Sequence, residues 1–179
     1  PLYEIVLSAY GLKRRQEKRW IPCEISQNLL IVKIPLGKAS EFVFKHLRLA
    51  TRKNVGIFVG ACACKNIRVG SVFIREESVL KDCKKKKIGV GIKIRKIKIV
   101  GIDDPFFSLE ILKKGSKPVC ADMEYNIFKR YFKKGVGVFV VTDNLSCLCE
   151  PRDKRFFEKR KGKILTAISF LETCLKNLK

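Results

Sequence analysis

The sequence has few acidic residues and almost no histidine. Of its 179 residues, 17 are Asp or Glu and 39 are Lys or Arg, which gives a formal net charge of +22. His46 has no second histidine with which to form a metal or catalytic pair, and no phosphate-binding P-loop is present. These absences argue against the common hydrolases and nucleotide-dependent enzymes. The sequence therefore predicts a protein that is not an enzyme and that needs no cofactor.

Long hydrophobic runs are also missing. No apolar segment approaches the roughly 18–20 residues of a transmembrane helix, so we expect no membrane partner. No signal peptide is visible, because Glu4 interrupts the apolar face of Leu2–Leu12 and no cleavage site follows. Without a secretory signal, a disulfide framework is not expected. The chain has eight cysteines that are predicted to be reduced and buried: Cys23, Cys62, Cys64, Cys83, Cys120, Cys147, Cys149 and Cys174.

Positive charge is abundant on a chain that is able to fold. Hydrophobic residues make up 46% of the sequence, which is enough to form a core. A net charge of +22 opposes compaction unless an anionic partner neutralises it. Nucleic acid is the first candidate for that partner, because its binding releases condensed counterions, and an anionic membrane surface is the second.

Apolar periodicity predicts short helices and strands along the chain. We expect a helix in Leu2–Leu12, strands at 20–25, 29–34 and 55–63, and a capped terminal helix from Ser169. From Ile92 to Ile99 apolar and basic residues alternate with one slip at Lys96, which indicates a β-bulge or a strand end. Residues 106–112 are the expected hairpin partner. A further helix follows Lys38, and its predicted core-facing stripe is Ala39, Phe42, Val43, Leu47 and Ala50.

The most ordered pattern spans residues 116–165. Ser116-Lys117-Pro118 precedes an amphipathic helix, Gly135-Val136-Gly137 opens the apolar strand Val138–Val141, and a polar turn runs from Thr142 to Ser146. The pattern closes at Gly162-Lys163-Ile164-Leu165. In order and spacing it resembles the C-terminal half of the small-subunit ribosomal protein S8 family. Pro35–Lys38 and the helix after it resemble the N-terminal half of that family more loosely.

The resemblance implies an α+β fold of two small α/β modules packed together, the second with a β-rich core and one short helix. It divides the chain into an N-terminal module (1–63), a basic insertion (64–90), a C-terminal module with the RNA-binding loop (91–168) and a helical extension (169–179). The loop departs from the family's Ser-Thr-Ser-x-Gly pattern, and Asp143 adds a negative charge there.

The implied function is that of a structural constituent of the small ribosomal subunit, which binds the central region of small-subunit rRNA and supports assembly and translation. Its partners would be rRNA and neighbouring small-subunit proteins, with no small-molecule substrate. Divergence from the bacterial pattern suggests a mitochondrial ribosome, with a plastid or bacterial cytoplasm as alternatives. The expected RNA contacts are Lys13, Arg14, Arg15, Lys38, Ser116, Lys117, Thr142, Asn144, Ser146, Arg152 and Arg155.

Two other functions compete with the ribosomal one. A zinc-binding nucleic-acid module could draw four thiolates from the pairs Cys62/Cys64 and Cys147/Cys149. An RNA-modifying enzyme or ribosome-assembly factor would need a cofactor loop, for which Gly89-Val90-Gly91 and Gly135-Val136-Gly137 are too short. The preferred hypothesis includes no metal.

Overall fold

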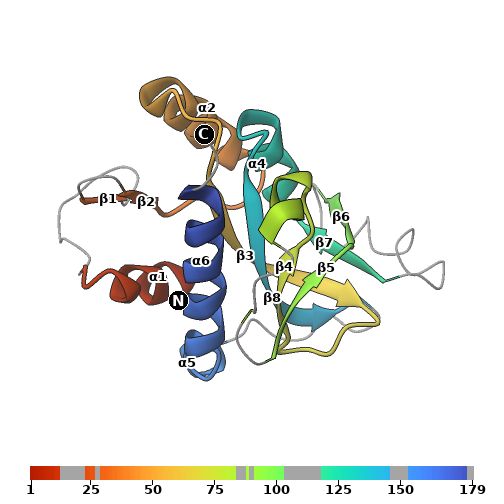
Figure 1. Cartoon of the computed structure of the whole chain (residues 1–179). Helices are drawn as coiled ribbons and strands as arrows, with labels where there is room; N and C mark the ends of the chain where they lie inside the picture. The colour runs from red at the N-terminus through yellow and green to blue at the C-terminus, as the bar shows by residue number, and fades with distance from the viewer. Residues whose placement is uncertain are drawn as a thin grey trace.

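Helices cover both faces of one curled six-stranded sheet (Figure 1). This computed structural model describes residues 1–12, 23–26, 29–83, 88, 91–102, 118–145 and 153–176. The strand order is β5-β4-β8-β3-β7-β6. The six strands are β3 (Ile57–Lys65), β4 (Val72–Arg75), β5 (Ile92–Arg95), β6 (Lys98–Gly101), β7 (Val119–Asp122) and β8 (Val136–Asn144).

The strand β8 lies at the centre of the sheet. It runs parallel to β3 and antiparallel to β4, while β3 pairs antiparallel with β7 on its other side. Residues 136–142 are all buried, as expected for an apolar strand covered on both faces. The predicted buried strand Val138–Val141 is therefore confirmed. Its odd and even positions contribute to two separate cores.

The first core lies under α1 (Leu2–Ala9), α5 (Lys154–Glu158) and α6 (Lys161–Lys176), and it includes Ile74, Val138 and Leu171. The second lies under α2 (Ala39–Thr51) and α4 (Tyr125–Tyr131). A separate two-stranded hairpin, β1 (Cys23–Ser26) and β2 (Leu29–Val32), packs on α1 through Ile31. None of the described helices is long and apolar enough to cross a membrane.

Aromatic rings hold α4 against the sheet and against α2. Phe128 stacks on Phe132 at a centroid distance of 5.1 Å, and Phe44 of α2 meets Phe128 edge-on at 5.6 Å. Phe58 of β3 lies 5.6 Å from Phe128. Such pairs add to the free energy gained from burying the rings. They fix the position of the turn that precedes α4.

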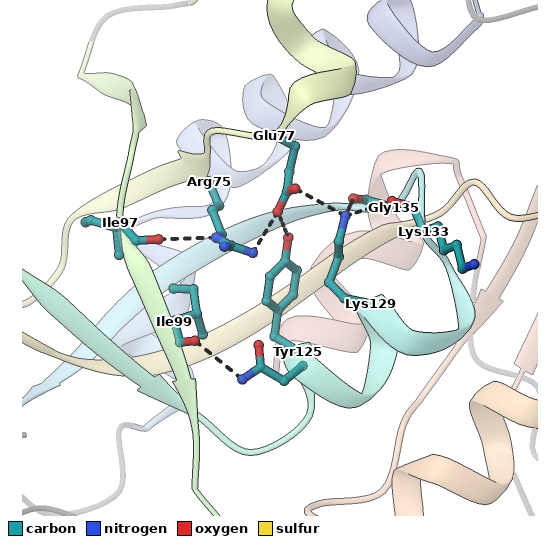
Figure 2. A network of polar contacts seen from close by, with 9 residues as sticks. Arg75, Glu77, Ile97, Ile99, Tyr125, Lys129, Lys133 and Gly135 are labelled. Atoms are coloured by element: carbon teal, nitrogen blue, oxygen red, sulfur yellow. Dashed lines mark hydrogen bonds and ion pairs between the residues drawn. The ribbon is translucent and has the colours of Figure 1, made fainter.

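A polar network ties α4 to the opposite part of the sheet (Figure 2). The carboxylate of Glu77 accepts hydrogen bonds from Tyr125 Oη at 2.6 Å and from Arg75 Nη1 at 2.8 Å, and Lys129 Nζ lies 3.2 Å away. Lys129 also donates to the backbone carbonyls of Lys133 and Gly135. Burial, followed by the hydrogen bond to Glu77, raises the pKa of Tyr125, so its hydroxyl remains a donor. The network restrains both ends of α4.

The prediction of an α+β fold is confirmed, but the arrangement as two packed modules is wrong. The strand β3 from the first half of the chain pairs directly with β8 from the second half, from Ile57↔Val136 to Cys64↔Asn144. The segment 64–90, expected to be a basic insertion, contributes β4 and the 3₁₀-helix η1 (Ser78–Cys83) to the fold. One sheet therefore integrates both halves.

Several local predictions also change. The slip at Lys96 is a strand end, because β5 pairs with β4 whereas β6 pairs with β7. The expected hairpin partner at 106–112 lies outside the described residues. Ser169 lies inside α6 and does not cap a new helix. The helix α2 is rotated relative to the prediction, since its buried residues are Ser40, Val43 and Phe44 while Ala39, Phe42 and Ala50 are exposed.

Candidate active site

An acidic side chain is buried at the carboxyl end of β7. Asp122 has 3% of its surface exposed, and its Oδ1 accepts hydrogen bonds from the backbone N–H groups of Glu124 at 2.8 Å and Tyr125 at 2.5 Å. Those N–H groups belong to the N-cap residue and the first residue of α4, so Asp122 fixes the chain where that helix begins. Among the described residues, its Oδ2 has no hydrogen-bond partner. Burial, with a smaller contribution from the charge of Glu124, raises the pKa of Asp122 to about 7.

A second carboxylate lies across β3 from Asp122. Asp143 on β8 is in register with Ala63, just after a shift in the pairing between Cys62 and Ala63. Asp122 continues the β7 pairing one step beyond Ala63↔Ala121. Both acids lie close enough to the buried thiol of Cys62 to affect its ionisation. Burial raises the pKa of Cys62, and the charges of Asp122 and Asp143 raise it further. Two carboxyl groups therefore flank Cys62.

A third acid, Glu124, connects this region to the loop before α2. One of its carboxylate oxygens accepts the backbone N–H of Gly37 at 2.5 Å. Gly37 has a φ of +64°, and a Cβ there would lie 3.2 Å from Met123 Cε, so a glycine suits this close approach. Burial raises the pKa of Glu124, an effect that the hydrogen bond from Gly37 partly opposes. Glu124 and Asp143 are both partly exposed, unlike Asp122.

Three sulfur atoms, those of Cys62, Cys64 and Cys120, come from β3 and β7, and β7 also carries Asp122. Cys64 on β3 and Cys120 on β7 form a disulfide, and Cys62 Sγ lies 3.4 Å from Cys64 Sγ. The C-x-C pair places both sulfurs on one face of its strand, as its period requires. The prediction that all cysteines are reduced is wrong for this pair. The four-thiolate zinc site is not supported, because Cys64 is engaged with Cys120 and Cys147 and Cys149 lie outside the described residues.

The predicted RNA contacts occupy different parts of the fold. Lys38 precedes α2 beside Gly37, Thr142 is buried and donates to the Cys62 carbonyl, and Asn144 is exposed at the end of β8. Arg155 is exposed on α5. Thus Lys38, Thr142 and Asn144 belong to segments that adjoin the acids, and Arg155 does not. The remaining predicted contacts lie outside the described residues: Lys13, Arg14, Arg15, Ser116, Lys117, Ser146 and Arg152.

The sequence analysis did not identify Asp122 and Glu124 as site residues. A usable signal was present, because two acids two positions apart follow an apolar strand and precede an apolar helix. Functional side chains often gather at the carboxyl ends of strands in α/β sheets. The ribosomal interpretation treats residues 119–134 as structural spacing around a helix, and it gives these two acids no functional role.

The architecture defines the class of protein that the chain resembles. Matching solved structures are nucleosidases, nucleoside phosphorylases and a related hydrolase. No family model matches the chain, and no curated sequence matches it either. The likeness to this class therefore rests on three-dimensional structure.

Three solved structures illustrate the likeness. A futalosine hydrolase mutant from Helicobacter pylori strain 26695 has a TM-score of 0.63 and 13% identity, covering 98% of this chain and 95% of that one. The 5'-methylthioadenosine/S-adenosyl homocysteine nucleosidase of Campylobacter jejuni has a TM-score of 0.59 and 10% identity, with coverages of 98% and 95%. Uridine phosphorylase isoform 2 of Schistosoma mansoni has a TM-score of 0.64 and 9% identity, with coverages of 93% and 80%. At such identities the likeness establishes the fold.

These matches overturn the ribosomal interpretation. The chain shares a nucleosidase-like fold over nearly its whole length, so the resemblance to ribosomal protein S8 is wrong. The predictions of a structural role in the small subunit, of rRNA and ribosomal proteins as partners, and of no small-molecule substrate are contradicted with it. So is the expectation that the chain is not an enzyme, because the structures that share its fold are enzymes. The pattern at residues 116–165 does not identify a family, because a helix, a glycine-flanked turn and a buried strand recur in unrelated α/β proteins.

Proposed function

We propose that the protein is an enzyme that cleaves the N-glycosidic bond of a nucleoside. The observation that carries this proposal is a group of three acids at neighbouring positions: Asp122 and Asp143 lie on either side of β3 close enough to raise the pKa of Cys62, and the charge of Glu124 raises the pKa of Asp122. The names of the structures that share the fold support a nucleoside as the substrate class. The reaction breaks the bond between the sugar C1' and a base nitrogen, so the sugar gains positive charge and the base needs a proton.

Acidic side chains meet both of these requirements. A carboxylate stabilises a sugar that develops oxocarbenium character, and a carboxylic acid protonates the leaving group. Glu124 and Asp143 are partly exposed and are the two acids able to touch a substrate. We assign Glu124 to the sugar, where its carboxylate accepts hydroxyl protons and faces the developing charge. Asp143 is assigned to proton donation to the departing base.

Asp122 has a positioning role in this proposal. With 3% exposure it is too buried to reach a substrate, but its Oδ1 holds the backbone N–H groups of Glu124 and Tyr125. The hydrogen bond between Glu124 and Gly37 fixes the same carboxylate from the other side. Such fixed geometry lowers the reorganisation needed during the reaction.

The direct test is to incubate purified protein with a panel of purine and pyrimidine nucleosides and to separate the released bases by chromatography. Parallel reactions with and without inorganic phosphate distinguish attack by phosphate from attack by water. We expect base release from at least one nucleoside, and a loss of kcat of at least about a hundredfold in Glu124→Gln and Asp143→Asn. Glu158→Gln, an exposed change on α5, is the matched control and leaves the rate unchanged. Absence of base release from every nucleoside, with the folded state verified by circular dichroism, would refute the proposal.

A further inference from the structure

The outer face of α2 carries large apolar side chains where a surface helix normally has polar ones. Phe42 is 50% exposed and Leu49 is 66% exposed, and Leu36, in the loop before the helix, is 80% exposed. Phe42, His46 and Leu49 are spaced four and three residues apart, so they share one side of the helix. The core contacts of α2 come from Ser40, Val43 and Phe44 on its other side. We call Leu36, Phe42, His46 and Leu49 the α2 outer face.

Most of the exposed large apolar side chains of the described residues lie on α2 or just before it. The exposed large apolar side chains of the described residues number four, and three of them belong to the α2 outer face, with Leu30 as the fourth. Within this face, the His46 ring packs on the Phe42 ring at a centroid distance of 3.9 Å. In Figure 1, α2 lies at the periphery of the molecule, away from the central strands. A clustered apolar patch on a protruding helix indicates a binding surface.

Basic residues border the patch. Lys45, Arg52 and Lys53 are exposed along the same helix and its end, within a chain whose net charge is +22. A partner must therefore tolerate apolar contact and supply negative charge. A second copy of this chain would bring a further +22 against the same basic border, which opposes self-association.

The small number of apolar side chains on α2 distinguishes between the two remaining kinds of partner, another protein and a lipid surface. A stable protein–protein interface takes roughly 20–30 residues a side and has an apolar centre within a polar rim, and for such a centre the described part of α2 offers only Phe42 and Leu49. An amphipathic helix at a lipid surface needs only a few, since Phe and Leu enter the acyl boundary while Lys and Arg meet anionic headgroups. We propose that the α2 outer face docks the protein onto an anionic lipid bilayer surface, without crossing it.

Co-sedimentation with vesicles tests the proposal on the full chain. Vesicles of phosphatidylcholine with about one-third phosphatidylserine should bind the protein, and vesicles of phosphatidylcholine alone should bind it at least about tenfold more weakly. Leu36→Ser and Leu49→Ser should each weaken binding to the anionic vesicles by at least about tenfold, because apolar carbons no longer enter the lipid. In Phe42→Trp, the added tryptophan fluorescence should shift to the blue only with anionic vesicles.

A matched pair of charge reversals separates docking through α2 from general attraction of a basic protein. Lys45→Glu and Lys159→Glu change the net charge equally, and both residues are exposed, on α2 and after α5 respectively. The proposal requires Lys45→Glu to weaken binding by at least about fivefold more than Lys159→Glu. Equal losses in the two variants, or no vesicle binding by the parent, would overturn it. So would a dimer in sedimentation velocity that Leu49→Ser dissociates, because a second copy would then cover this face.

Discussion

The buried carboxyl of Asp122 makes the stability of the protein depend on pH. The pKa of this carboxyl is about 7 in the folded protein and 3.8 for an aspartate side chain in water, a difference of about 3. The folded state therefore binds more protons than the unfolded state between about pH 4 and pH 7. The free energy of unfolding accordingly falls as the pH rises through this window. At 1.36 kcal/mol per unit, the loss is about 4 kcal/mol once the pH exceeds 7.

Asp122→Asn removes this dependence. The amide oxygen can still accept the N–H groups of Glu124 and Tyr125, but no charge has to be desolvated. The Asn Nδ2 takes the place of Oδ2, which has no partner among the described residues, and leaving it unpaired costs roughly 1–3 kcal/mol. We therefore expect the variant to be more stable than the parent by about 2 kcal/mol at pH 8. At pH 4.5 the order reverses, because the parent side chain is then neutral.

Urea denaturation followed by circular dichroism, at half-unit steps from pH 4.5 to pH 8, measures both curves. Asp122→Ala is the control, because it loses both hydrogen bonds to the start of α4 and should be destabilised by about 1–2 kcal/mol relative to the Asn variant at every pH. If parent and Asn variant lose stability in parallel as the pH rises, the reasoning about a buried neutral carboxyl is wrong.

Three further predictions concern stability and packing. Glu77→Gln removes the partly buried anion that Arg75 and Lys129 share and should lower the free energy of unfolding by about 1–3 kcal/mol in chemical denaturation, whereas Tyr125→Phe should lower it by about 1 kcal/mol; equal small effects would contradict the network. Gly60→Ala places a Cβ 2.3 Å from the Phe58 ring and should lower the free energy of unfolding by about 1–3 kcal/mol. Gly162→Ala in α6, where the new Cβ meets nothing within 4 Å, should raise it by up to about 1 kcal/mol in the same denaturation experiment. Phe139→Ala opens a cavity between the rings of Phe73 and Tyr125 and should cost about 3–5 kcal/mol, and a change below 1 kcal/mol would show that these rings repack.

Local structure could be predicted from the sequence where one physical pattern dominates. The apolar run Val138–Val141 permits only a strand covered on both faces, and the 3.6-residue period near Leu2 and Ala39 permits only helices. The rotation of α2 could not be read in the same way, because Phe42, Phe44, Leu47 and Leu49 place apolar groups around most of the helix. Such a pattern does not identify the face that meets the core.

Long-range pairing was the larger obstacle. The alternation at Ile92–Ile99 predicts a strand, bulged or ended at Lys96, that pairs with residues 106–112, and nothing in it indicates that β5 and β6 lie at opposite edges of the sheet. The candidate site depends on this arrangement, since Asp122 and Asp143 are 21 positions apart and approach only because β7 and β8 both flank β3. Spacing along the chain carries no signal for such a meeting. The ribosomal resemblance therefore rests on local order alone.

The central place of β8 has a consequence for how the chain acquires its structure. β3 and β4 are neighbours in sequence, yet β8 separates them in the sheet. A nascent chain that has emerged only to residue 135 thus exposes two strands whose shared partner, β8, has not yet emerged. Closing this gap brings together segments about 80 residues apart, which is entropically costly and slow. We expect the sheet to form late, after most of the polypeptide has left the exit tunnel, and early release to leave β3 and β4 with exposed edges that favour aggregation.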